Sequence, residues 1–217
     1  MARWEGDARG RLERAALELF GEQGYDRTTI AQIARRANLT ERSFYRWFTD
    51  KREVLFGGGQ DLENQLVSAI EATPADTDAL SVLLAAFATA PEVFRSREFL
   101  LKRSAVIAAN PPLQERELIK LVSLSGALTA VLVRRGCDEQ LARLATDVGM
   151  AVLRLTSERC LADEQADFAQ VLSASAADLI AVTRLPLLRA LDGLPAFDEH
   201  RGPQLAREVV AHPRMDD

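Results

Sequence analysis

Residues 28–56 read TTIAQIARRANLTERSFYRWFTDKREVLF, and two short helices joined by a tight turn are predicted from them. Thr29 and Gln32 have the S/T-x-x-E/Q spacing of a capping box, which favours the start of a helix. This helix is expected to end by Asn38, because asparagine tolerates the left-handed backbone conformation that a tight turn needs. Thr40 is a suitable N-cap for the next helix.

The segments on either side of this stretch are also predicted to be helical. Residues 7–23 carry apolar side chains at helical spacing and are followed by Gly24, which is typical of a helix end. On the other side, Asp50 and Glu53 have the spacing of a capping box, in which each side chain accepts the backbone N–H of the other residue. This pair predicts a fourth helix through Leu55.

Three consecutive glycines, residues 57–59, interrupt this fourth helix. Each interior glycine costs about 1 kcal/mol relative to alanine in a helix, so the chain is expected to fray or hinge here. We therefore predict a domain boundary, with one domain over residues 1–56 and a second over residues 57–190.

The second domain is predicted to contain one helix after another. Apolar stripes of helical period cover residues 61–72, 76–90, 91–109, 112–135, 138–161 and 164–190, and proline or glycine marks their borders. The predicted fold class is all-α, with about nine helices: an amino-terminal three-helix domain with a helix-turn-helix, and a carboxy-terminal helical bundle. Residues 191–217 mix glycine and proline with charges and predict a mobile tail.

Composition excludes several classes of protein. With 217 residues, 47% of them hydrophobic, the chain can bury a large core without disulfides or metals. It shows no signal peptide and no apolar run of membrane-spanning length, which predicts a cytoplasmic protein without membrane contact. Cys137 and Cys160 lack a C-x-x-C context, and the two histidines, His200 and His212, lie in the predicted tail. We therefore expect no enzyme activity, no cofactor and no metal site.

Charge is distributed unevenly along the chain. The formal net charge is -5, but residues 1–52 hold 11 Lys and Arg against 8 Asp and Glu, and the remainder hold 16 against 24. This asymmetry is compatible with a basic nucleic-acid-binding module on an acidic body. An ordinary solvated charged surface explains the small positive excess more simply.

Residue identity goes further than spacing. The threonine pair and I-A of residues 28–31, Leu39 with Thr40, and the aromatic pair Phe44 and Tyr45 resemble the amino-terminal domain of the tetracycline-repressor (TetR) family of bacterial transcription regulators. The stretch ALELFGEQGYDRTT, residues 16–29, is similar to the first helix and loop of that family. The resemblance implies a ligand-responsive, DNA-binding regulator, most often a repressor. It departs from the family at Asn38, where glycine is usual, and at the glycine triplet.

In this interpretation the second of the two short helices enters the major groove of a DNA duplex. Side chains expected to contact the phosphate backbone are Thr28, Thr29, Thr40, Ser43, Tyr45 and Lys51. Side chains expected to project from the same helix are Glu41, Arg42, Arg46 and Trp47. Arg42 is the best candidate for a bidentate contact with guanine N7 and O6. Trp47 is expected either to contact a thymine methyl or sugar or to lie half buried against the neighbouring helix.

A DNA-reading unit of this size makes few contacts, so two copies on one duplex are expected. The resemblance implies a homodimer formed through the last two long helices, residues 138–161 and 164–190. Their apolar stripes contain Leu141, Leu144, Ala145, Val148, Val152 and Leu155 in the first helix and Phe168, Val171, Leu172, Leu179 and Val182 in the second. The alternative is that both stripes close the core of the single chain.

The middle of the bundle is predicted to bind a small-molecule effector, because helical bodies place such sites between helices. The candidates are the apolar residues Phe87, Phe94, Leu100 and Val122 and the polar residues Arg103, Ser104 and Thr129. Residues 94–121 also resemble an actinobacterial TetR subgroup whose carboxy-terminal domain is described as binding acyl-CoA-like ligands. A second hypothesis is a helical small-molecule carrier or adaptor that does not bind DNA. Such a carrier has no reason to expose Arg42 and Arg46 beside Lys51.

Overall fold

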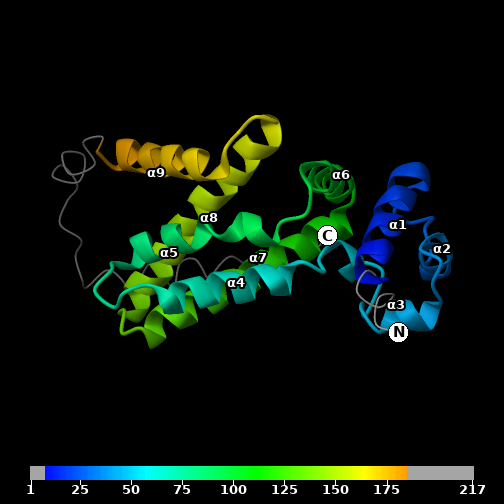
Figure 1. The fold of residues 1–217 in the computed structure, drawn as a ribbon, viewed down its shortest axis with the longest axis horizontal. Coiled ribbons are helices and arrows are strands. Elements are labelled where there is room, and N and C mark those ends of the chain that lie inside the picture. Colours follow the sequence, from blue (N-terminus) through cyan, green and yellow to red (C-terminus); the bar gives the residue numbers. More distant parts are fainter. Residues whose placement is uncertain (1–7, 185–217) are drawn as a thin grey trace, which may run out of the picture. The chain divides into compact units, whose positions relative to one another are not determined.

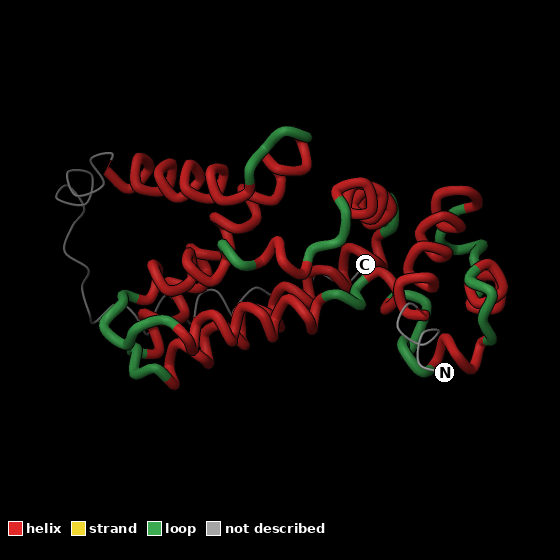
Figure 2. The backbone as a smooth tube through the Cα atoms, in the orientation of Figure 1, coloured by secondary structure: helices red, strands yellow, loops and turns green. Residues whose placement is uncertain are grey.

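The computed structural model describes residues 8–184, and every regular element in this range is helical (Figures 1 and 2). The prediction of an all-α fold is therefore confirmed. The α-helices of this range are α1 (Ala8–Gln23), α2 (Ile30–Arg36), α3 (Glu41–Tyr45), α4 (Gly59–Ala72), α5 (Ala79–Phe87), α6 (Arg97–Ala108), α7 (Pro111–Arg134), α8 (Glu139–Ala162) and α9 (Phe168–Arg184). Two short 3-10 turns, η1 (Glu53–Leu55) and η2 (Ala90–Val93), lie between them.

Contacts divide the chain after Ala176, within α9. The first compact unit contains α1 to α8 and the start of α9, and the boundary predicted at residues 57–59 lies inside it, in the turn before α4. The described part of the second unit is the remainder of α9. The predicted tail, residues 191–217, lies outside the described residues.

The two short helices and their turn form as predicted. The Thr29 hydroxyl accepts the N–H of Gln32 at 3.2 Å, and the Gln32 side chain accepts the N–H of Thr29 at 2.8 Å, so both halves of the capping box are present. Asn38 has a φ of 54°, which is the left-handed conformation expected at the turn. Thr40 caps α3 by accepting the N–H of Ser43 at 3.1 Å. Helix α3 is short and ends at Tyr45.

The amino-terminal helices share one apolar core with the helices that follow α5. Phe44 and Phe48 of the α3 region pack with Leu12 of α1, and Ile107 of α6 and Leu113 of α7 belong to the same core. Burying each such side chain stabilises the fold by about 1.5–3 kcal/mol. The segment that resembles a DNA-binding domain is therefore packed directly against α6 and α7, which lie beside it in Figure 1.

The prediction of a fourth helix opening at Asp50 is wrong: only the 3-10 turn η1 forms there. Asp50 does accept the N–H of Glu53, at 3.2 Å. The Glu53 carboxylate does not return to cap the helix, however, because it pairs with Arg116 and Lys120 of α7. A tertiary ion pair has replaced the local capping contact.

Gly57 is required by close packing, which the sequence pattern did not indicate. A Cβ atom at this position would lie 2.7 Å from Oε1 of Glu13 and 2.9 Å from Cε1 of Phe48. By contrast, a Cβ at Gly58 or Gly59 would meet nothing within 4 Å. Of the three glycines, only Gly57 is therefore required by its neighbours.

The rest of the first unit is built on α4, α5, α7 and α8. Helices α5 and α7 each pack against both α4 and α8. The fully buried side chains of this core include Leu66 and Ile70 of α4, Leu83 and Phe87 of α5, and Leu128 and Leu132 of α7. The predicted helix over residues 91–109 is divided into η2 and α6, because Ser96 begins α6 as its N-cap. None of the described helices is both long enough and apolar enough to cross a lipid bilayer.

Candidate nucleic-acid interface

Helix α3 and the residues after it divide into a buried face and an exposed face. Phe44 and Phe48 are buried in the core, whereas Tyr45 and Trp47 are 57% and 44% exposed. The predicted reading residues Glu41, Arg42 and Arg46 are exposed as well. We call the exposed set, residues 41, 42 and 45–47, the reading surface. Exposed aromatic rings next to arginine are typical of a binding surface.

The threonines predicted to contact phosphate have different surroundings. Thr28 is buried, and its hydroxyl donates to the carbonyl oxygen of Gly24 at 2.8 Å. Thr29 and Thr40 are exposed and stand at the N-termini of α2 and α3. Thr40 further shares a hydrogen bond of 3.0 Å with Ser43. These phosphate contacts stay predictions.

Lys51 has a structural role that the sequence did not indicate. Its Nζ donates to the carbonyl oxygens of Tyr25 at 2.7 Å and Thr28 at 2.9 Å, and it lies 4.1 Å from the centroid of the Tyr25 ring. Burial lowers the pKa of Lys51. An ammonium group has three N–H donors, so these two hydrogen bonds leave one for a phosphate. Lys51 therefore secures the loop before α2 while it retains a donor.

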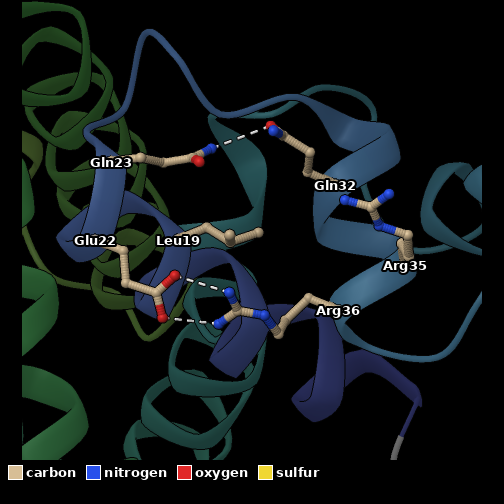
Figure 3. Close-up of a pocket in the computed structure, with 6 residues that line it drawn as sticks. All are labelled: Leu19, Glu22, Gln23, Gln32, Arg35 and Arg36. Atoms are coloured by element: carbon tan, nitrogen blue, oxygen red, sulfur yellow. Dashed lines mark hydrogen bonds and ion pairs between the residues drawn. The ribbon is translucent and has the colours of Figure 1, made fainter.

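A polar hollow of about 210 Å³ lies between α1 and α2 (Figure 3). Arg36 donates to both carboxylate oxygens of Glu22, at 2.9 and 2.7 Å, and the Gln23 side chain donates to that of Gln32 at 3.1 Å. Most of the polar lining is thus engaged in joining the two helices. We assign the hollow a role in holding α2 against α1.

Glu13 of α1 is a buried carboxylate that the sequence pattern did not single out. Its side chain is only 4% exposed and meets Arg9 at 3.1 Å and Arg95, which precedes α6, at 2.6 Å. Arg9 also reaches Asp61 of α4, at 3.1 Å. Burial raises the pKa of Glu13 despite the two arginines. A sequence signal existed, because Glu13 lies at helical spacing from the buried Phe20.

Arg103 and Glu53 make a second connection between α6, α7 and the amino-terminal helices. Arg103 donates to the carbonyl oxygen of Leu55 at 2.7 Å and to Glu117 at 3.0 Å, and its guanidinium lies 4.9 Å from the centroid of the Phe56 ring. Glu53 pairs with Arg116 and with Lys120, the latter at 3.0 Å. The sequence predicts Arg103 in the effector site. In the structure its partners are Leu55, Phe56 and Glu117, where α6 and α7 meet the amino-terminal helices.

The other predicted ligand residues lie in several different surroundings. Phe87 is fully buried in the core of α4, α5, α7 and α8. The Phe94 ring packs against Phe168, with centroids 5.6 Å apart, and Val122 is 72% exposed on α7. Leu100 and Thr129 are half buried, and Ser104 is exposed on α6. The structure does not gather these side chains around one common partner, and the ligand site stays a prediction.

The apolar stripe of α8 is shared between core and surface. Ala145 and Val152 are buried in the first unit, whereas Leu141 and Leu144 are 55% and 61% exposed. In α9, Leu172 is buried in the first unit. Part of the stripe therefore closes the core of the chain, and two leucines of α8 stay uncovered in the single chain.

Comparisons with known proteins agree with this description. Residues 13–56 match the family model "Bacterial regulatory proteins, tetR family". The transcriptional regulator TcmR of Streptomyces glaucescens is 38% identical over 79 residues, which are 36% of this chain and 35% of TcmR. The regulator HbdR of Aromatoleum sp. (strain CIB) is 46% identical over 50 residues, which are 23% of this chain and 22% of HbdR. The chain thus matches only about a third or less of the length of these curated relatives.

Solved structures extend the likeness in fold beyond this segment. The structure of NalD, a secondary repressor from Pseudomonas aeruginosa, aligns with a TM-score of 0.53 over 82% of this chain and 95% of NalD, at 19% identity. The matched amino-terminal segment, the curated relatives and the fold agree with one another. Residues 13–56 of this chain are thus similar to the tetR family of bacterial regulatory proteins, and the fold of the chain agrees with that likeness.

Proposed function

We propose that this chain is a ligand-responsive, DNA-binding transcriptional regulator, and specifically a repressor that leaves its operator when a small apolar or amphipathic effector binds. The observation that carries the proposal is the reading surface on α3. Arg42, Tyr45, Arg46 and Trp47 are exposed directly after a capped turn, inside the segment that matches the TetR family model. A carrier without DNA binding does not account for this exposure.

Helix α3 enters the major groove in the proposed complex. Arg42 presents its guanidinium to guanine N7 and O6, because its two parallel N–H groups match these two acceptors. Thr29, Thr40, Tyr45 and Lys51 contact phosphate groups and set the register of α3 without distinguishing bases. The N-termini of α2 and α3 add backbone N–H groups to these contacts.

The test of base reading is the substitution Arg42→Ala. Footprinting of genomic fragments with the purified protein first identifies a bound duplex. Arg42→Ala then weakens binding to that duplex by about 1–3 kcal/mol and relaxes the preference at one base pair. Arg134→Ala, which removes an exposed arginine from α7, is the matched control and leaves binding unchanged. Equal binding of wild type and Arg42→Ala across a base-substitution series would reject the assignment.

The test of phosphate contact is the substitution Lys51→Ala. Loss of this ammonium weakens binding to all duplexes alike and lowers the slope of log affinity against log salt concentration by about one. Lys51 also secures the Tyr25–Thr28 loop, so the free energy of unfolding is measured in parallel. A slope equal to that of the wild type would show that Lys51 supports the fold alone.

We also propose that the regulator is a homodimer formed through α8 and α9. Two reading surfaces on one duplex need half-sites about 34 Å apart, which one copy cannot reach. The exposed Leu141 and Leu144 supply part of an apolar contact surface on α8. Light scattering on the eluting protein is expected to give twice the chain mass, and Leu144→Arg is expected to give the single-chain mass. A wild-type protein that elutes as a single chain contradicts this proposal.

The effector is proposed to bind within residues 57–190 and to have an acyl-CoA-like character. It releases DNA only if it binds more tightly to the dimer shape whose reading surfaces have the wrong separation. Mass spectrometry of ligand carried through purification identifies the class. Titration of acyl-CoA into the protein–DNA complex tests it directly, and no release at saturating acyl-CoA rejects this class of effector.

A further inference from the structure

Arg11 of α1 reaches across to the turn between α2 and α3. Its Nε donates to the carbonyl oxygen of Ala37 at 3.0 Å, and its Nη2 donates to the carbonyl oxygens of Ala37 and of Asn38, the latter at 2.9 Å. Ala37 is the C-cap of α2, and Asn38 is the residue in the left-handed conformation. One guanidinium therefore holds two successive carbonyl groups of the turn.

These two carbonyls are the ones that the turn itself does not use. The N–H of Leu39 donates to the carbonyl of Ala34 at 2.8 Å, and the N–H of Asn38 donates to that of Arg35 at 3.0 Å. This is the hydrogen-bond pattern of a Schellman motif, which satisfies carbonyls within the last turn of the helix. The carbonyls of Ala37 and Asn38 lie beyond that pattern and receive Arg11.

Three physical effects favour a guanidinium at this place. The carboxyl end of a helix carries partial negative charge, which a cation stabilises. Hydrogen bonds from a charged donor are stronger than those between neutral groups. The N–H groups of arginine are fixed in a planar fork, so two acceptors are held in a defined geometry, whereas a lysine ammonium acts as a point charge.

We propose that Arg11 is a positioning residue for DNA reading: it ties the α2–α3 turn to α1 and thereby sets the direction in which α3 presents the reading surface. The proposal rests on the proposed DNA-binding function. Helix α1 is a firm reference for this purpose, because Leu12, Ala16 and Leu19 are buried in the core. Arg11 acts through the turn and not by touching the duplex.

The experiment compares Arg11→Lys with Arg135→Lys. Both variants keep the charge and remove the fork, but Arg135 donates to the carbonyl oxygens of Ile70, Thr73 and Pro74 at the end of α4, and not to the α2–α3 turn. For each variant, urea unfolding, affinity for the footprinted duplex and the salt dependence of that affinity are measured. Arg11→Lys is expected to weaken binding by about tenfold, the scale of one charge-assisted hydrogen bond, with an unchanged salt slope. Arg135→Lys is expected to bind DNA like the wild type.

A second variant separates positioning from folding. Glycine adopts a positive φ without strain, so Asn38→Gly eases the conformation that Arg11 holds in place. In the background of Asn38→Gly, Arg11→Lys is expected to lose less affinity than it does alone. If Arg11→Lys alone is too unstable to assay, the double variant is compared with Asn38→Gly, and equal affinity of these two proteins contradicts the proposal.

Three outcomes would overturn the inference. Wild-type affinity in folded Arg11→Lys means that the hydrogen bonds from Arg11 to the turn have no effect on DNA binding. A salt slope lower by about one in the charge-removing variant Arg11→Gln means that Arg11 itself contacts phosphate. A loss as large in the Asn38→Gly background as alone means that the turn is not the route of the effect. Failure of the wild-type protein to bind any duplex is a distinct result, because it rejects the proposed function as well.

Discussion

Glu13 and Glu53 both extend from the amino-terminal helices to cations near or within α6 and α7, yet their pKa values move in opposite directions. Burial raises the pKa of Glu13, and Arg95 and Arg9 do not reverse this effect. For Glu53 burial acts in the same upward sense, but the hydrogen bonds from Arg116 and Lys120 outweigh it, and its pKa is lowered. The side chains are 4% and 14% exposed. Two carboxylates with similar cationic partners thus have pKa shifts of opposite sign, because they are desolvated to different extents.

The comparison separates an ion pair that stabilises from one that is tolerated. The charged form of Glu53 is favoured by the fold, so its pairing with α7 contributes to stability. The charged form of Glu13 is disfavoured, because moving a carboxylate out of water costs more than its pairs return. Glu13 consequently links α1 to Arg95 without adding much free energy. Four measurements test this distinction.

The largest effect is expected from Gly57→Val, which disturbs the surroundings of Glu13. The added side chain would meet the Glu13 carboxylate and the Phe48 ring at less than 3 Å, and the free energy of unfolding is expected to fall by about 3 kcal/mol. Urea denaturation at neutral pH measures the change. Gly58→Ala is the control and stays close to the wild type, because a Cβ there meets nothing within 4 Å. Wild-type stability in Gly57→Val would show that the neighbours move aside freely.

Glu53→Gln is expected to have the next largest effect. Loss of the charge weakens the hydrogen bonds with Arg116 and Lys120, and the free energy of unfolding is expected to fall by about 2 kcal/mol. The control is Glu98→Gln, which breaks the exposed pair with Lys102 within α6 and is expected to leave stability unchanged. Should both variants unfold at the same urea concentration, the Glu53 contact adds nothing to stability.

Glu13→Gln is expected to lower the free energy of unfolding by less than about 1 kcal/mol, which is less than the loss expected for Glu53→Gln. The reason is that the neutral amide removes the penalty of burying a charge. Arg95 retains access to water and does not become a buried unpaired cation, since its side chain is 43% exposed. The same urea series provides the measurement. A larger loss for Glu13→Gln than for Glu53→Gln reverses the ranking on which the comparison depends.

The smallest effect is a difference in pH dependence. The folded pKa of Glu13 is raised above its unfolded value of about 4.5. Its contribution to stability is therefore present below pH 4.5 and is lost as pH rises through the folded pKa. The folded pKa of Glu53 is lowered, so its contribution is present above pH 4.5 and is lost as pH falls through the folded pKa. The wild-type advantage over Glu13→Gln should therefore shrink above pH 4.5, and that over Glu53→Gln should shrink below it. Parallel profiles for the two variants would contradict this.

The turn between α2 and α3 was predictable from the sequence because the residues that form it are close together in the chain. The capping box of Thr29, the left-handed turn at Asn38 and the N-cap at Thr40 involve residues at most three positions apart, and all three are confirmed. The Asp50 helix was predicted by the same reasoning and is wrong, because the second half of its capping pair was drawn away by α7. A local preference of about 1 kcal/mol does not withstand a competing tertiary ion pair.

The amino-acid sequence alone predicted the helical class and the capped turn between α2 and α3, because apolar spacing and capping act within one or two turns of a helix. The tertiary structure alone decided which distant side chains meet that turn and which partners Glu53 finds. Arg11 meets a turn 26 residues away, and Glu53 meets a helix 63 residues away. Separations of this size carry no periodic signal, and they become contacts only when burial of the shared apolar core brings α1, η1, α6 and α7 together.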